Sequence, residues 1–260
     1  MSYVECPSLL YPLLEKLREL EAISVLAIIG SYAKGISTPQ SDIDLLLIVN
    51  NGFETDSLQT ALHQVYGNVT LSTADDVYQA TISGTTVSFA VRSKQFICHL
   101  KALTIGCLAP VEIRPWVIGG NIPEVLITDI KSSIILIDRE GEFGQLSKLL
   151  LNGYPKSMKS MAILHLSKEL TQKACLVINT ENPVLKVIGF YEVLIQYVRI
   201  VSLHYNIMNF GIKHYFKRQG GEIGNIINKQ YFTSPIVDPV IINTELSNMI
   251  REVEVYASEY

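Results

Sequence analysis

The stretch that decides the fold runs from residue 25 to residue 49 and reads VLAIIGSYAKGISTPQSDIDLLLIV. It begins and ends with compact apolar runs, 25–29 and 43–49, which are typical of buried strands. Between these runs lie a Gly-Ser pair at 30–31 and a turn-rich segment, and an Asp-x-Asp pattern at 42–44 overlaps the start of the second run. The sequence therefore predicts two buried strands whose connection carries the polar groups.

The Gly-Ser pair follows directly after the first buried strand. Gly30 lets the backbone come close to a phosphate, because it has no side chain. The Ser31 hydroxyl and the N-terminus of the helix expected next can donate hydrogen bonds to phosphate oxygens. Lys34 is a further candidate for a phosphate contact, although a lysine in a turn is more often simply solvated. We therefore expect a phosphate-binding turn here.

Two carboxylates stand at the start of the second strand. Asp42 and Asp44 are two residues apart, so in extended backbone both project to the same side. Such a pair suits a hard divalent cation, which takes oxygen ligands and bridges to substrate phosphates. An isolated Asp-x-Asp would more simply begin a strand on a solvated edge, but the preceding Gly-Ser pair favours the metal-binding interpretation.

Together, these residues resemble the nucleotidyltransferase superfamily that includes DNA polymerase beta and the aminoglycoside and lincosamide adenylyltransferases. The shared pattern is a strand, Gly-Ser, a short helix, and Asp-hydrophobic-Asp on the next strand. The resemblance implies that Gly30 and Ser31 bind the nucleotide's phosphates. It also implies that Asp42 and Asp44 are catalytic and hold Mg²⁺.

The activity implied by this resemblance is transfer of a nucleoside monophosphate. The donor would be MgATP or another nucleoside triphosphate, the acceptor a hydroxyl of a small molecule, and the second product pyrophosphate. Mg²⁺ would neutralise the triphosphate and help the acceptor oxygen attack the α-phosphorus.

The sequence departs from the family pattern at the third carboxylate. Ser88 stands on the strand where Asp or Glu is expected, and a hydroxyl cannot replace a carboxylate as a base or metal ligand. One explanation is that the strand is misaligned and another acid approaches, namely Asp75, Asp76 or Glu112. The acceptor could instead carry its own base. In the remaining alternative the protein no longer transfers anything and serves as a nucleotide-binding regulatory or interaction protein.

The order of elements predicts an α+β fold with an α/β-type first domain and a mixed sheet. Helices and strands alternate up to about residue 140, with helices expected at 11–21, 56–66, 93–104 and 124–132 and strands at 25–29, 43–49, 78–82, 87–91 and 134–137. Long helical patterns follow at 157–178, 184–208 and 244–257. We therefore predict a nucleotidyltransferase domain over 1–145 and a helical bundle over 146–260. By resemblance, the bundle helps to form the acceptor pocket.

Composition narrows the classes of partner. The chain has 260 residues, of which 48% are hydrophobic, enough for a substantial core. Its formal net charge of -4 provides no basic field for a polyanion, so a nucleic-acid partner is disfavoured. Its four cysteines show no CxxC pairing, and charges interrupt the apolar stretches. We therefore expect a cytoplasmic protein without a membrane span.

Overall fold

The structure is a computed structural model that describes residues 7–74, 77–105, 123–207, 226 and 235–260. The chain forms two compact units, Met1–Lys101 with Asp129–Leu151, and Ala102–Thr128 with Asn152–Tyr260. The domain division expected between 145 and 146 stays a prediction. Two helices cross from one unit to the other along the chain: α4 (Gln95–Thr104) and α5 (Pro123–Ser132).

The first unit is built around a six-stranded sheet. Its other elements, in chain order, are η1 (Ser8–Leu10), α1 (Tyr11–Glu19), β1 (Ile23–Ile29), α2 (Gly30–Ala33), β2 (Ile43–Val49), α3 (Thr55–Tyr66), β3 (Ser72–Ala74), β4 (Val77–Ile82), β5 (Thr85–Ser93), β6 (Ile134–Asp138), α6 (Glu142–Leu149) and η2 (Leu150–Asn152). The strand order is β3-β4-β5-β2-β1-β6. β2 and β5 run parallel, whereas the remaining neighbours are antiparallel. The mixed sheet with its helices confirms the predicted α+β class.

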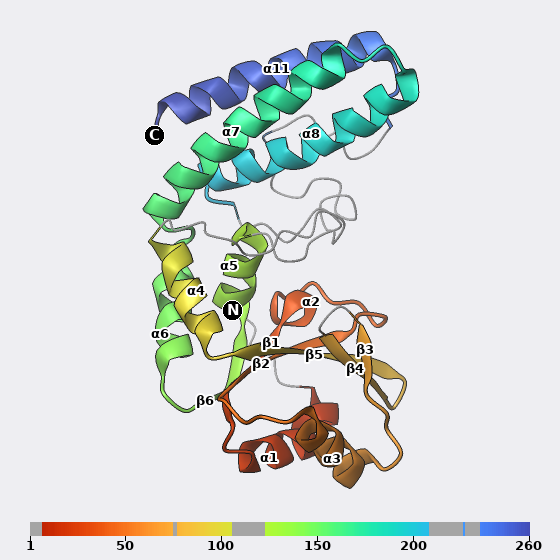
Figure 1. Ribbon diagram of the computed structural model, residues 1–260, viewed down its shortest axis with the longest axis vertical. Helices are drawn as coiled ribbons and strands as arrows, with labels where there is room; N and C mark the ends of the chain where they lie inside the picture. Colours follow the sequence, from red (N-terminus) through yellow and green to blue (C-terminus); the bar gives the residue numbers. More distant parts are fainter. Residues whose placement is uncertain (1–6, 75–76, 106–122, 208–225, 227–234) are drawn as a thin grey trace. The chain divides into compact units, whose positions relative to one another are not determined.

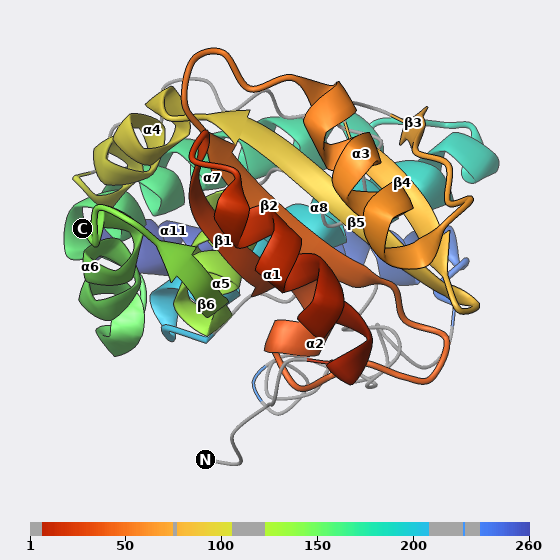
Figure 2. The same ribbon diagram turned by 90° about the horizontal axis from the view of Figure 1, so that it is seen from below.

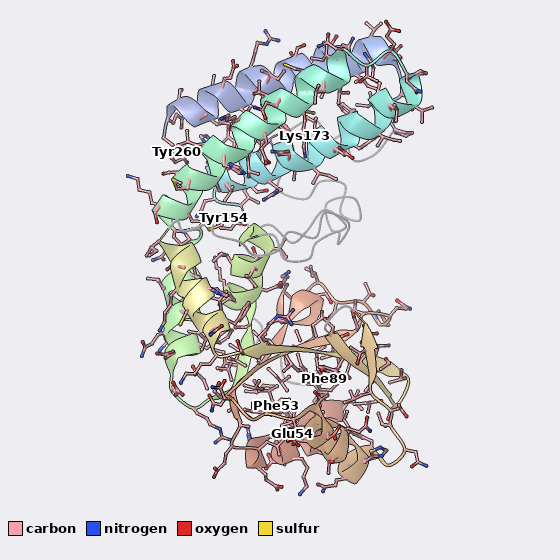
Figure 3. The ribbon with its side chains drawn as sticks, in the orientation of Figure 1. Phe53, Glu54, Phe89, Tyr154, Lys173 and Tyr260 are labelled. Atoms are coloured by element: carbon pink, nitrogen blue, oxygen red, sulfur yellow. The ribbon has the colours of Figure 1, made fainter. Side chains whose placement is uncertain are left out.

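The core of this unit lies on one face of the sheet. Strand side chains alternate between faces, and on β2 the alternate residues from Ile43 to Val49 join the core cluster. Leucines of α1 and α3 pack against them, and both helices lie on the same side of the sheet (Figures 1 and 2). Phe89 of β5 is fully buried in this layer (Figure 3). Asp44 projects from the opposite face, at the end of β2 where its burial is incomplete.

The hairpin between β4 and β5 turns at Ser83 and Gly84. Ser83 and Gly84 have φ angles of 49° and 83°, respectively. Positive φ at both central residues is the conformation that twists in the same sense as the flanking strands. The turn fixes the register of β5 against β4 and so sets Gln79 opposite Ser88.

Within the residues that the structure describes, the second unit has three long helices: α7 (Lys156–Ile178), α8 (Pro183–His204) and α11 (Pro239–Ser258). They pack on one another through buried aliphatic and aromatic side chains. α8 and α11 begin alike, with Asn182 and Asp238 accepting hydrogen bonds from backbone N–H groups of the first turn and a proline following each cap. Such caps satisfy donors that have no partner inside the helix. Helices were predicted in all three regions.

An aromatic cluster lies around His204 at the end of α8. Its imidazole stacks on Tyr256, with ring centroids 4.2 Å apart, and the rings of Tyr205 and Tyr260 approach it edge-on. Burial lowers the pKa of His204, Lys159 adds to that shift, and Glu259 opposes it. The folded protein therefore disfavours the protonated imidazole.

This shift predicts that acid weakens the fold through His204. Between the lowered pKa of the folded state and the ordinary value of about 6.5, the unfolded chain binds a proton that the folded chain does not. The free energy of unfolding should thus fall as the pH drops through about 6.5, by at most about 1.4 kcal/mol per pH unit from this one group. Urea unfolding from pH 8 to 5 should show a shallower dependence in His204→Gln. Identical slopes in the two proteins would contradict the assignment.

Candidate functional site

The turn after β1 brings Gly30 against Asp44. Gly30 has a φ of 69°, in the left-handed region that favours glycine. A Cβ built on Gly30 would stand 2.1 Å from Asp44 Oδ2, far closer than two such atoms can approach. Ile29 pairs with Asp44 across β1 and β2, which brings this carboxylate to the turn. The two features recognised in the sequence therefore meet at one place.

Backbone hydrogen bonds close the turn itself. The N–H of Lys34 donates to the carbonyl of Gly30 at 3.2 Å, and that of Ile36 donates to the carbonyl of Ser31 at 3.0 Å. α2 has only four residues, so its dipole is too short to attract an anion strongly. What the turn can offer a phosphate is the Ser31 hydroxyl and local N–H groups. Ser31 is half-buried.

Asp42 lies just before β2, at the same end of the strand as Asp44. It is exposed and lines a polar cavity of about 290 Å³, together with Pro39, Gln40, Ser41, Gly84, Thr85 and Thr86. The loop leading to Asp42 is held by Thr38 and Ser41, since each donates a backbone N–H at 2.9 Å, to the Ser41 hydroxyl and the Thr38 carbonyl respectively. Asp44 thus borders the Gly-Ser turn, and Asp42 borders the cavity beside the β4–β5 turn.

Ser88 lies next to Asp44. The parallel register pairs Asp44 of β2 with Ser88 of β5, and Ser88 in turn pairs with Gln79 of β4. Residues paired in this way project from the same face of a sheet. Ser88 is buried, and Gln79 Nε2 donates to its hydroxyl at 3.4 Å. A neutral polar pair therefore continues the row that Asp44 begins.

The structure supplies no third acid to this place among the residues it describes. No group of three or more His, Cys, Asp or Glu side chains in that part of the chain could hold a metal ion. The three acids considered as replacements for Ser88, namely Asp75, Asp76 and Glu112, lie outside the described residues. Ser88 is thus the residue that stands beside Asp44 in the sheet.

Lys34 is buried and paired, which the sequence did not indicate. Its Nζ lies 2.7 Å from Oδ1 of Asp129 on α5, and the side chains are 4% and 18% exposed. The interpretation of Lys34 as a solvated side chain, considered from the sequence, is therefore wrong. No local pattern marks Asp129, which lies far along the chain and belongs to a helix whose sequence shows only apolar periodicity.

The donor set fits a hard divalent cation. Asp42 and Asp44 offer carboxylate oxygens at one end of β2, the ligand type that Mg²⁺ prefers. Gly30 leaves to the Asp44 carboxylate the space that a side chain would fill. The residues present therefore fit Mg²⁺ beside the Gly-Ser turn.

Comparison with known proteins agrees with this geometry. Residues 10–95 match the nucleotidyltransferase domain family. This match covers α1 to β5 and includes all five residues discussed as site candidates from the sequence: Gly30, Ser31, Lys34, Asp42 and Asp44. The polymerase beta-like resemblance is thus supported over the first part of the chain.

The remaining comparisons add less. The chain is similar to the crystal structure of a nucleotidyltransferase-like protein from Exiguobacterium sibiricum 255-15, at 12% identity and a TM-score of 0.49. That alignment covers 95% of this chain and 74% of the other. No curated protein matches the sequence. In the described part of the chain, every helix is too short or too polar to cross a membrane.

Two glycines provide a matched test of the contact between Gly30 and Asp44. Gly30→Ala and Gly35→Ala both place alanine at positive φ, 69° and 66°, which should cost each about 1–2 kcal/mol of stability. Of these two positions only Gly30 lacks room for a Cβ; at Gly35 no described residue other than the immediate neighbours along the chain lies within 4 Å of one. Calorimetric titration with MgATP should therefore show binding weakened about 10-fold or more in Gly30→Ala alone. Equal losses in both variants would contradict the proposed role of this contact.

Replacing Ser88 tests whether its position faces the expected metal site at Asp42 and Asp44. Ser88→Asp buries a third carboxylate beside Asp44, so like-charge repulsion should lower the melting temperature without divalent cations. Added Mg²⁺ should then raise it by about 3 °C or more, because a cation bound only by the folded state stabilises that state. In Ser88→Asn the new side chain has nearly the same size as aspartate but no charge. The melting temperature of this variant should therefore respond to Mg²⁺ no more than that of the wild type. An equal response in both variants would place Ser88 away from any cation.

Proposed function

We propose that the protein transfers a nucleoside monophosphate, AMP from MgATP, to a hydroxyl of a small-molecule acceptor and releases pyrophosphate. The observation that carries this proposal is the packing of the Asp44 carboxylate against Gly30, within residues that match a nucleotidyltransferase domain. A carboxylate held at a glycine turn can bind a cation that also contacts phosphate oxygens at that turn.

Each residue then has a distinct task. Ser31 and the backbone N–H groups of the turn bind and orient the triphosphate. Asp42 and Asp44 hold Mg²⁺, which, when bound, neutralises charge on the phosphates and makes the α-phosphorus easier to attack. Asp42 is the acid that borders the polar cavity, so we place the acceptor hydroxyl on its side of β2. The helical unit is proposed to contribute to the acceptor pocket, as the family resemblance implies.

Ser88 limits how the acceptor is activated. Its hydroxyl does not ionise near neutral pH, so it cannot take the acceptor's proton. With Gln79 it supplies a neutral hydrogen-bonding surface beside Asp44. Among the described residues this leaves proton removal to Asp42 or to the acceptor itself. The match to a transferase domain favours transfer over a protein that only binds nucleotide.

The proposed acceptor is small because the charge does not suit a polymer. A net charge of -4 gives no long-range attraction for a nucleic-acid chain. A nucleoside triphosphate is held by short-range contacts and by its own cation, so it does not need that field. A hydroxylated small molecule, without a negative charge, meets the same surface without repulsion.

The proposal predicts that pyrophosphate release depends on both acids. Purified protein with MgATP and a panel of hydroxylated compounds should release pyrophosphate with at least one acceptor. Asp42→Asn and Asp44→Asn, which keep the size of the side chain but remove its charge, should each lower the rate about 100-fold or more. Asp56→Asn makes the same change at an exposed position of α3 and should leave the rate unchanged.

Two outcomes would overturn the proposal in different ways. Undiminished release in the Asp42→Asn/Asp44→Asn double variant would remove the metal site. Calorimetric binding of MgATP, with no product formed from any acceptor or from water, would instead identify a nucleotide-binding protein without transfer activity. The other nucleoside triphosphates should be run in parallel, since the preference for ATP is part of the proposal.

A further inference from the structure

The ion pair between Lys34 and Asp129 lies at the base of the Gly-Ser turn. Lys34 is the residue that ends α2, and its backbone N–H donates to the carbonyl of Gly30. Its side-chain ammonium lies 2.7 Å from the Asp129 carboxylate, and only 4% of the lysine side chain is exposed. One residue is thus bonded to the turn by its backbone and to α5 by its side chain.

The burial of both side chains makes this ion pair unfavourable to break. Taking an ammonium out of water is strongly unfavourable unless an opposite charge compensates it. Asp129 provides that charge, and its own side chain is only 18% exposed. Moving Lys34 towards a bound triphosphate would leave the Asp129 carboxylate largely buried without its countercharge. The ion pair between Lys34 and Asp129 should therefore remain formed when a nucleotide binds.

We propose that Asp129 is a positioning residue that acts through Lys34 to fix the Gly-Ser turn at its contact with Asp44. Lys34 serves as an anchor, and the triphosphate is met by the turn's N–H groups, the Ser31 hydroxyl and the metal. The place of the turn depends on this anchor because α2 is a single short turn of helix. An isolated helix of that length has no stability of its own. The effect on nucleotide binding rests on the proposed function, whereas the anchoring of the turn does not.

The anchor can be measured without any nucleotide. Amide hydrogen exchange of Lys34, Gly35 and Ile36 reports the turn directly, since these N–H groups donate to the carbonyls of Gly30, Tyr32 and Ser31. Exchange at these three amides should be at least about 10-fold faster in Asp129→Asn and in Lys34→Met than in the wild type, because opening the turn becomes easier. Lys34→Arg keeps the charge and should keep slow exchange. Asp138→Asn changes another half-buried carboxylate of the same unit and should leave these amides unaffected.

Nucleotide binding separates an anchor from a direct phosphate ligand. With MgATP in a calorimeter, Lys34→Met and Asp129→Asn should each weaken binding about 10-fold, and the Lys34→Met/Asp129→Asn double variant should be no worse than either, because all three lose the same pair. A lysine that binds phosphate directly would give a different result. Lys34→Met would then weaken binding while Asp129→Asn left it equal or tighter, and that result would overturn the proposal.

The double variant also serves as a control for loss of folding in the single variants. A single change leaves one buried charge without its partner, whereas the double variant leaves none and should fold. Its far-UV circular dichroism should match the wild type while its three turn amides exchange fast. Unchanged exchange in a folded double variant would overturn the anchor even if MgATP binds normally. Failure of the wild type to bind MgATP would overturn the proposed function, and the exchange result would still decide the anchor.

Discussion

The close approach of Asp44 to Gly30 is the constraint on which the rest of the first unit depends. A carboxylate can occupy this place only because residue 30 has no Cβ, and residue 30 can turn the chain there only because glycine accepts positive φ. The antiparallel register of β1 and β2 makes the approach unavoidable, since it sets Ile29 opposite Asp44. The space for the Asp44 carboxylate and the placement of its charge at the turn therefore depend on the same two residues, Gly30 and Asp44. The register of β1 against β2 brings these two residues together.

The acid Asp44 stands at one end of a strand that is otherwise packed on both faces of the sheet. On β2, one set of alternate residues packs under α1 and α3, and the other set begins with Asp44 and continues with buried apolar residues. Because β2 is buried over nearly its whole length, Asp44 is carried on a rigid strand. Neighbouring strands add Ser88 and Gln79 to the same row without adding charge. A site on such a strand holds its geometry better than one assembled from loops alone.

The sequence predicted those helices and strands that depend on the pattern of apolar residues close together along the chain. Apolar runs predicted β1 and β2, and helical spacing predicted α1, α3 and the long helices of the second unit. The short strand β3 and the helix α6 were missed, because three residues carry no period and α6 is brief. Asp129 was missed for another reason. Its pairing with Lys34 depends on how distant segments pack, and no spacing along the chain encodes that.

The balance of charge around the turn connects these observations. From sequence, Lys34 would bring a positive charge to the phosphates, but in the fold Asp129 compensates that charge within a buried pair. Ser88 contributes no charge where a carboxylate was expected. Asp42 and Asp44 then offer two carboxylates at the end of β2, whose charge one divalent cation would balance under the proposed function. A triphosphate would be repelled by these acids alone, so under the proposed function it binds together with its cation, and the anchored turn needs only to supply neutral donors.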